Sequence, residues 1–86
     1  MIGQFVISKA GHDKDEVYII IEENDKQLLL SDGEYKKTGN PKRKNRKHVS
    51  FTTEYLKPEQ TEKLKVLDEE ANLLIKREIR RFKKKG

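Results

Sequence analysis

The chain has 86 residues, of which 41% are charged and 33% are hydrophobic, and its formal net charge is +5. This length predicts one small domain with a single modest core. The apolar residues are clustered rather than diluted, which indicates a folded chain rather than a disordered one. The chain contains no cysteine, which excludes disulfides and the common structural zinc sites that use Cys ligands.

The N-terminal segment gives no sign of export. Residues 1–11 (MIGQFVISKAG) lack the basic region and the long apolar run of a secretory signal. No stretch comes near the roughly 20 apolar residues that span a bilayer. We therefore expect a cytoplasmic protein, a location with which the absence of cysteine is compatible.

The charges are segregated along the chain. Residues 36–49 carry a net charge of +7 and residues 76–86 carry +6, whereas residues 1–35 carry −5 and residues 50–75 carry −3. Solubility does not require such segregation. Basic blocks of this size usually meet nucleic acid or an anionic surface, so we expect a polyanionic partner.

The first third of the chain predicts three β-strands. Residues 4–8 (QFVIS), 17–23 (VYIIIEE) and 27–31 (QLLLS) are short, apolar and β-prone. A polar loop over residues 9–16 separates the first two strands. The second strand is apolar on both of its faces, which indicates a central position in the sheet.

A turn and two more strands complete the predicted sheet. Asp32–Gly33 is a strong hairpin signal, because glycine accepts a positive φ without steric cost. Residues 34–37 (EYKK) predict a short fourth strand, which TGNP at 38–41 ends. The basic run then forms a loop that leads into a fifth strand at 47–52 (KHVSFT). Short strands at close spacing predict a small barrel, here over residues 1–53, because closure protects the strand edges.

Residues 54–86 predict a helical, basic extension that packs on the barrel. Pro58 suits the first turn of a helix, and apolar residues follow at helical spacing. The members of this stripe are Leu64, Leu67, Ala71, Leu74, Ile75, Ile79 and Phe82. One helix over residues 58–84 is the simplest interpretation, and two helices with a break near 71–74 are the alternative.

The segment GQFVISKAGHDKDEVYIII resembles the KOW motif, a strand–loop–strand unit of RNA-binding ribosomal and transcription-elongation proteins. The matching positions are Val6–Ile7, Lys9–Gly11, Asp13–Lys14 and the apolar run from Val17. The continuation LLLSDGEYKKTGNPKRKNRKHV is similar to small bacterial KOW-domain proteins, which in turn resemble eukaryotic and archaeal large-subunit ribosomal protein fourteen. The resemblance covers residues 1 to about 50. The chain departs from it at Asp15, where the family often has glycine.

The resemblance implies an SH3-like β-barrel that binds structured RNA, with ribosomal RNA as the expected partner. It implies that the loop around Lys9, Gly11, His12 and Lys14 fits against the RNA. Gly11 would let the two backbones approach closely. Asp15 would bring a negative charge into this loop, which weakens the loop as the main contact.

The basic segment is the main predicted RNA contact. Its side chains can neutralise phosphates and release counterions, and its arginines can also grip a phosphate in a bidentate manner. The candidates are Lys36, Lys37, Lys42, Arg43, Lys44, Arg46, Lys47 and His48. A mobile solvated loop and a nuclear localisation signal (PKRKNRK) are the alternatives.

The C-terminal tail offers a second basic surface. Arg77, Arg80 and Arg81, together with Lys84, are spaced to share one face of a helix. They are candidates for phosphate contact. Compensation of the helix dipole, together with solubility, explains these basic residues equally well. Binding to an anionic membrane is a poorer one, because the chain has no Trp and few large apolar residues to insert.

Three further side chains are candidates for contact with RNA. Tyr35 lies between the Asp-Gly turn and the basic segment, and it can either stack on an unpaired base or fill the core. His12 and His48 lack the additional ligands of a metal site. We expect both histidines to meet phosphate or solvent.

Catalysis is not expected. Asp13, Asp15 and Glu16 cluster in a polar loop, where no pocket would desolvate them. The sequence contains no nucleophile elbow and no phosphate-binding glycine loop. We therefore expect no enzymatic activity, no cofactor and no small-molecule substrate.

The sequence thus predicts a monomeric RNA-binding protein of the ribosome or its surroundings. Ribosomal proteins are possible additional partners. A module that docks on a ribosomal or transcription-machinery protein is the alternative, because SH3-like barrels commonly bind proteins and the N-terminal half is acidic. Binding to duplex DNA is a third hypothesis.

Overall fold

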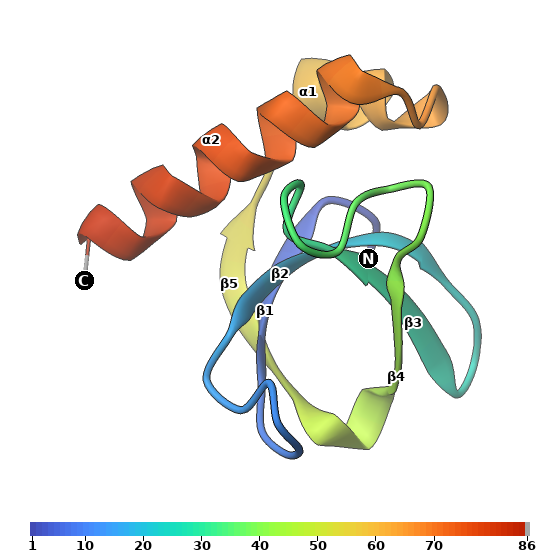
Figure 1. The fold of residues 1–86 in the computed structure, drawn as a ribbon, viewed down its shortest axis with the longest axis vertical. Coiled ribbons are helices and arrows are strands. Elements are labelled where there is room, and N and C mark those ends of the chain that lie inside the picture. The colour runs from blue at the N-terminus through green and yellow to red at the C-terminus, as the bar shows by residue number, and fades with distance from the viewer. Residues whose placement is uncertain (86) are drawn as a thin grey trace.

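The computed structural model describes residues 1–85. It contains one antiparallel sheet with the strand order β4-β3-β2-β1-β5. The strands are β1 (Gln4–Ser8), β2 (Val17–Glu23), β3 (Gln27–Ser31), β4 (Lys42–Asn45) and β5 (Val49–Tyr55). A single 3-10 turn, η1 (Arg46–His48), joins the two outermost strands, so the sheet curls into a small SH3-like barrel (Figure 1).

The first three predicted strands are confirmed, and β2 lies in the centre of the sheet as its two apolar faces indicated. Tyr18 and Ile20 point into the barrel, whereas Val17, Ile19 and Ile21 point toward the helices. The central strand therefore contributes to two separate cores.

One core fills the barrel and the other lies between the sheet and the helical segment. The barrel core consists of Val6, Tyr18, Ile20, Leu28, Leu30 and Val49. The second core joins Phe5, Ile19 and Ile21 of the sheet to Leu64, Ala71, Ile75 and Ile79 of the helical segment. Because each core is small, the domain depends on the helices to cover one face of its sheet (Figure 1).

The predicted fourth strand at residues 34–37 is wrong. These residues belong to a long loop between β3 and β4, in which Oδ1 of Asp32 accepts hydrogen bonds from the backbone N–H groups of Glu34 and Lys36. The basic run itself is the fourth strand, and its residues pair with Gln27–Leu30. Lys, Arg and Asn are weak strand formers, but tertiary pairing outweighs their propensity.

The fifth predicted strand is confirmed with shifted bounds. It begins at Val49 and continues to Tyr55, whereas Lys47 and His48 belong to η1. The last residues of β5 therefore lie beyond residue 53, where the sequence suggested that the barrel ends.

Of the two interpretations of the C-terminal segment, two helices are confirmed and the single helix over residues 58–84 is wrong. The segment forms α1 (Pro58–Glu62), the 3-10 turn η2 (Lys63–Lys65) and α2 (Glu69–Lys85). The interruption falls at residues 66–68 rather than near 71–74. Val66 is extended, and Oδ1 of Asp68 accepts a hydrogen bond from the N–H of Ala71 at 3.1 Å, which caps the start of α2.

Most of the predicted apolar stripe packs as expected. Five of its members are buried, namely Leu64, Ala71, Leu74, Ile75 and Ile79. Phe82 stacks on Phe5 with ring centroids 5.0 Å apart. Leu67 is the exception at 45% exposed, because it lies in the interruption between the helices.

Candidate nucleic-acid interface

The basic segment of residues 36–49 extends through three parts of the fold. Lys36 and Lys37 lie in the β3–β4 loop, where Nζ of Lys37 is 3.8 Å from a carboxylate oxygen of Glu69 on α2. Residues 42–45 form β4, and residues 46–48 form η1 at the opposite end of the barrel from α2 (Figure 1). The segment is therefore not a single patch.

Lys44 is engaged inside the fold. Its Nζ lies 2.8 Å from Oδ1 of Asp13 and donates to the carbonyl oxygen of Ala10 at 2.9 Å. The side chains of Lys44 and Asp13 are only 10% and 13% exposed. Lys44 lies opposite Leu28 in the sheet, which directs it toward the barrel interior. It therefore ties the β1–β2 loop to β4 instead of facing solvent.

Two hydroxyl groups complete the network around Asp13. Ser8 Oγ donates to Oδ1 at 3.1 Å, and Tyr18 Oη donates to Oδ2 at 3.2 Å. Burial alone would raise the pKa of Asp13, but hydrogen bonds from Lys44, Ser8 and Tyr18 and the charge of Lys44 outweigh it and lower this pKa. Burial and the carboxylate of Asp13 raise the pKa of Tyr18. The acid is thus ionised and neutralised by its lysine partner.

Arg46 is also engaged in structure. Its Nη1 lies 2.9 Å from Oε1 of Glu23, and its guanidinium lies 5.2 Å from the centroid of the Phe51 ring. The hydrogen bond from Arg46 is the main cause that lowers the pKa of Glu23. This cation–π contact and ion pair connect η1 to β2 and β5.

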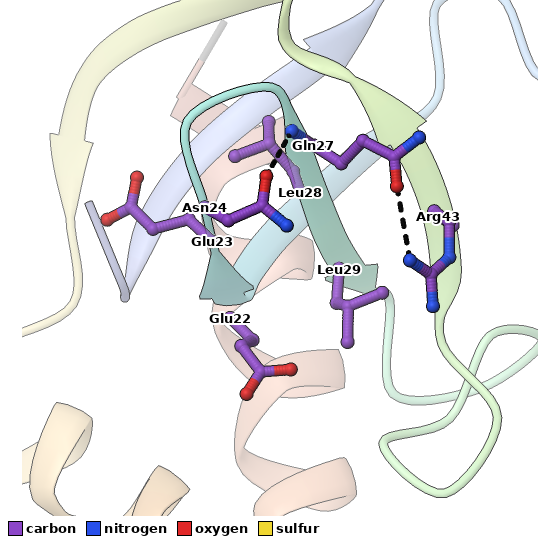
Figure 2. Close-up of a pocket in the computed structure, with 7 residues that line it drawn as sticks. All are labelled: Glu22, Glu23, Asn24, Gln27, Leu28, Leu29 and Arg43. Atoms are coloured by element: carbon purple, nitrogen blue, oxygen red, sulfur yellow. Dashed lines mark hydrogen bonds between the residues drawn. The ribbon is translucent and has the colours of Figure 1, made fainter.

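Arg43 lies on the outer side of β4, beside a shallow pocket (Figure 2). Its Nη1 donates to Oε1 of Gln27 at 3.1 Å. Glu22 and Glu23 line the same pocket, so acids outnumber bases there and the pocket does not suit a phosphate. Lys42, half-buried, lies opposite Leu30 at the start of the strand.

The β1–β2 loop and η1 lie side by side at the end of the barrel away from α2 (Figure 1). The backbone N–H of Lys9 donates to the carbonyl oxygen of His48 at 2.8 Å and joins the two segments. We define the barrel-end surface as Lys9, His12, Lys14, Lys47 and His48, all of which are exposed. Asp15 and Glu16 are exposed in the same loop.

Two residues of the β1–β2 loop have left-handed backbone. Gly11 has φ +86 and is exposed, and Asp15 has φ +73. Asp15 is the one non-glycine residue with positive φ among residues 1–85. A glycine would adopt this conformation without strain, which is a physical reason for glycine at this position of a similar loop.

The outward side of α2 carries the second basic surface. We define the helix surface as Leu73, Lys76, Arg77, Arg80, Arg81 and Lys84, which together line a shallow depression. Spacings of three and four residues place them on one face, opposite the buried Ile75 and Ile79. The expectation that Arg77, Arg80, Arg81 and Lys84 share one helix face is confirmed.

Tyr35 lies near this helix surface and does not fill a core. It is 83% exposed in the β3–β4 loop. Together with Arg80 and Lys83 it lines a groove between the loop and α2, to which Asp32 and Glu34 also contribute. The sequence did not indicate this neighbourhood, because Tyr35 and Arg80 are far apart in the chain.

The structure thus brings the β1–β2 loop and η1 together at the end of the barrel away from α2, and only Glu16 of that loop lines a groove with Tyr35 and Arg80 (Figure 1). The sequence missed the Lys44–Asp13 pair, because nothing in a basic run marks one lysine as inward-facing until the strand that contains it is known. Neither helix in residues 1–85 is long and apolar enough to cross a membrane. Within the same residues, no three His, Cys, Asp or Glu side chains gather as metal ligands would. Comparison of the chain with protein-family models and with curated proteins finds no match.

Proposed function

We propose that this protein binds structured RNA, such as ribosomal RNA, through the barrel-end surface and without catalysis. The observation that carries the proposal is the junction of the β1–β2 loop with η1 through Lys9 and His48. This junction gathers cations from two segments that are far apart in the sequence. An exposed basic surface suits the phosphates of a folded RNA.

The ammonium groups of this surface are available to a ligand. Within residues 1–85, no carboxylate forms an ion pair with Lys9, Lys14 or Lys47. Each can therefore replace condensed counterions on a phosphate. Exposed Gly11 has no side chain to hold an RNA backbone away from the loop.

The Lys44–Asp13 pair supports this use of the loop. An unpaired carboxylate in the loop repels phosphate, and Lys44 neutralises that of Asp13 from within the barrel, which leaves Asp15 and Glu16 as the exposed acids of the loop. We therefore assign Lys44 and Arg46 a structural part in the interface, and contact with RNA to the exposed residues around them.

The resemblance to KOW-domain proteins agrees with this proposal and suggests its setting. We infer a cytoplasmic, monomeric protein that acts on or near the ribosome, where ribosomal proteins would be additional neighbours. The alternative function is docking on a protein partner without RNA binding. The following experiment distinguishes the two.

The experiment measures binding of the purified protein to a structured RNA, for example a ribosomal RNA fragment, at several salt concentrations. If Z phosphates are contacted, the logarithm of affinity should fall with the logarithm of salt with a slope of about −0.7Z to −0.9Z. The variant Lys9→Gln/Lys14→Gln/Lys47→Gln should weaken binding and reduce the size of that slope by about 2.

The control Lys57→Gln/Lys63→Gln/Lys65→Gln removes the same charge from the segment around α1, at the far end of the molecule from η1 (Figure 1). It should bind nearly as well as the unchanged protein. Equal losses in both variants would show that net charge alone drives binding. Absence of binding in dilute buffer would refute the proposal and favour a protein partner.

A further inference from the structure

We propose that the helix surface is a second RNA-binding surface and that one molecule holds two RNA segments at once, one at each end. This inference rests on the proposed function, because the barrel-end surface supplies the first contact. The consequence is a bridging activity, in which the protein brings two RNA helices or two distant parts of one RNA together.

The helix surface has the chemistry of a phosphate-binding face. Arg77 and Arg81 are 60% and 68% exposed, so their guanidinium groups can reach a ligand. Arg80 and Lys84 are exposed as well, and within residues 1–85 neither forms an ion pair. The depression that these side chains line is shallow, as contact with a convex RNA backbone requires.

Glu78 pairs with two arginines of this surface. Its carboxylate lies 3.3 Å from Nε of Arg77 and 3.6 Å from Nη1 of Arg81, and its side chain is only 12% exposed. The acid therefore offsets part of the charge of Arg77 and Arg81. Within residues 1–85, the unpaired cations Arg80 and Lys84 keep the surface basic.

The two basic surfaces lie at opposite ends of the molecule. In Figure 1, α2 crosses one end of the barrel, whereas the β1–β2 loop and η1 lie at the other end. Between them, Glu16, Asp32 and Glu34 line one groove with Tyr35 and Arg80. These carboxylates repel phosphate, so each basic surface can attract its own segment of RNA.

The side of the barrel along β4 does not join the two surfaces into one track. Lys44 is paired with Asp13, and Arg46 is paired with Glu23. Glu22 and Glu23 lie in the pocket beside Arg43 (Figure 2). A single RNA that followed β4 from end to end would meet these carboxylates, so two separate segments fit the charge distribution better.

The experiment uses two structured RNA hairpins, one labelled with a fluorescence donor and the other with an acceptor, and the full-length protein. At one protein per two hairpins, energy transfer should appear. A large excess of protein should abolish it, because each hairpin then has its own protein. The variant Arg80→Gln/Arg81→Gln/Lys84→Gln should bind one hairpin through the barrel end but lose energy transfer, and Lys9→Gln/Lys14→Gln/Lys47→Gln should lose it as well.

The control Lys57→Gln/Lys63→Gln/Lys65→Gln should keep energy transfer at the level of the unchanged protein. Binding of a single hairpin without energy transfer would overturn the inference and leave the proposed function intact. Energy transfer that persists in excess protein, or that survives the helix substitutions, would also overturn it, since self-association would then explain the signal. Failure to bind any hairpin would refute the proposed function itself.

Discussion

At the scale of single residues, the direction of each side chain decides whether a basic residue pairs within the fold or remains exposed to a ligand. Lys44 and Lys47 are three positions apart and identical in chemistry, yet the first is half-buried and paired with Asp13, and the second is exposed. A charge buried with its partner costs much more to disturb than a solvated one. Residues of one basic run therefore divide into structural members and members free to bind.

Lys44→Met should destabilise the protein by about 2 kcal/mol, because the half-buried carboxylate of Asp13 would lose its cation. Lys47→Met, the matched control, should change the free energy of unfolding by no more than about 0.5 kcal/mol. Urea unfolding measures both. Adding Asp13→Asn to Lys44→Met should restore part of the loss, and a double variant no more stable than Lys44→Met would contradict the proposed pairing.

The same pair predicts a dependence of stability on pH. The pKa of Asp13 is lower in the folded protein than its ordinary value. The contribution of Asp13 to the free energy of unfolding is therefore complete above the pKa of the unfolded chain, about 3.9. It is lost as the pH falls through the lower pKa of the folded protein. The acid-induced loss of stability should be smaller in Asp13→Asn than in the unchanged protein.

Asp15 has a backbone conformation that residues with a side chain disfavour. At φ +73 a side chain costs up to about 2 kcal/mol, although aspartate tolerates this region better than most residues. Asp15→Gly should raise the free energy of unfolding by up to about 1 kcal/mol, whereas Asp15→Ala should lower it. Both substitutions remove the charge, so a difference between them in thermal unfolding isolates the backbone. Equal stabilities would show that φ at this position is relaxed.

At the scale of elements, the β3–β4 loop and α2 depend on each other. The N–H of Thr38 donates to Oδ1 of Asn72 at 2.8 Å, and Gly33 lies against the backbone of α2. This docking places Tyr35 beside Arg80 and Lys83. The helix surface is thus assembled from two elements rather than from α2 alone.

Gly33→Ala should destabilise the protein by at least about 2 kcal/mol. Gly33 has φ +76, and an added Cβ would lie 2.8 Å from the backbone nitrogen of Lys76 and even closer to the carbonyl oxygen of Asn72. Gly39→Ala in the same loop meets no atom within 4 Å and should be nearly neutral. Chemical denaturation compares the two, and equal stabilities would contradict the close packing of the loop on α2.

At the scale of the whole molecule, the distribution of charge separates the proposed RNA surfaces. The two basic surfaces occupy opposite ends, and the carboxylates of β2 occupy a side between them. The salt dependence of binding and the energy-transfer experiment therefore report on different properties, the number of phosphate contacts and their division between two segments. The proposed bridging of RNA needs no second domain, because α2 and η1 lie at opposite ends of one barrel (Figure 1).

The sequence by itself determined the elements whose local patterns are strong. The short apolar runs of β1, β2 and β3 were predicted with their bounds, and the two apolar faces of β2 predicted its central position, because alternation along a strand depends on local geometry alone. The helical stripe was predicted for the same reason. Its interruption was misplaced, because the cap at Asp68 is a short polar signal within a charged segment.

Only the tertiary structure decided what the charged residues do. Strand β4 has no local strand signal and forms because β3 needs a partner, and its register then turns Lys44 inward and leaves Arg43 outside. The junction of Lys9 with His48 and the neighbourhood of Tyr35 and Arg80 join residues that are distant in the chain. Charge alone cannot predict such contacts. A lysine has the same charge and the same strand propensity whether its ammonium group pairs with a carboxylate inside the fold or is solvated by water.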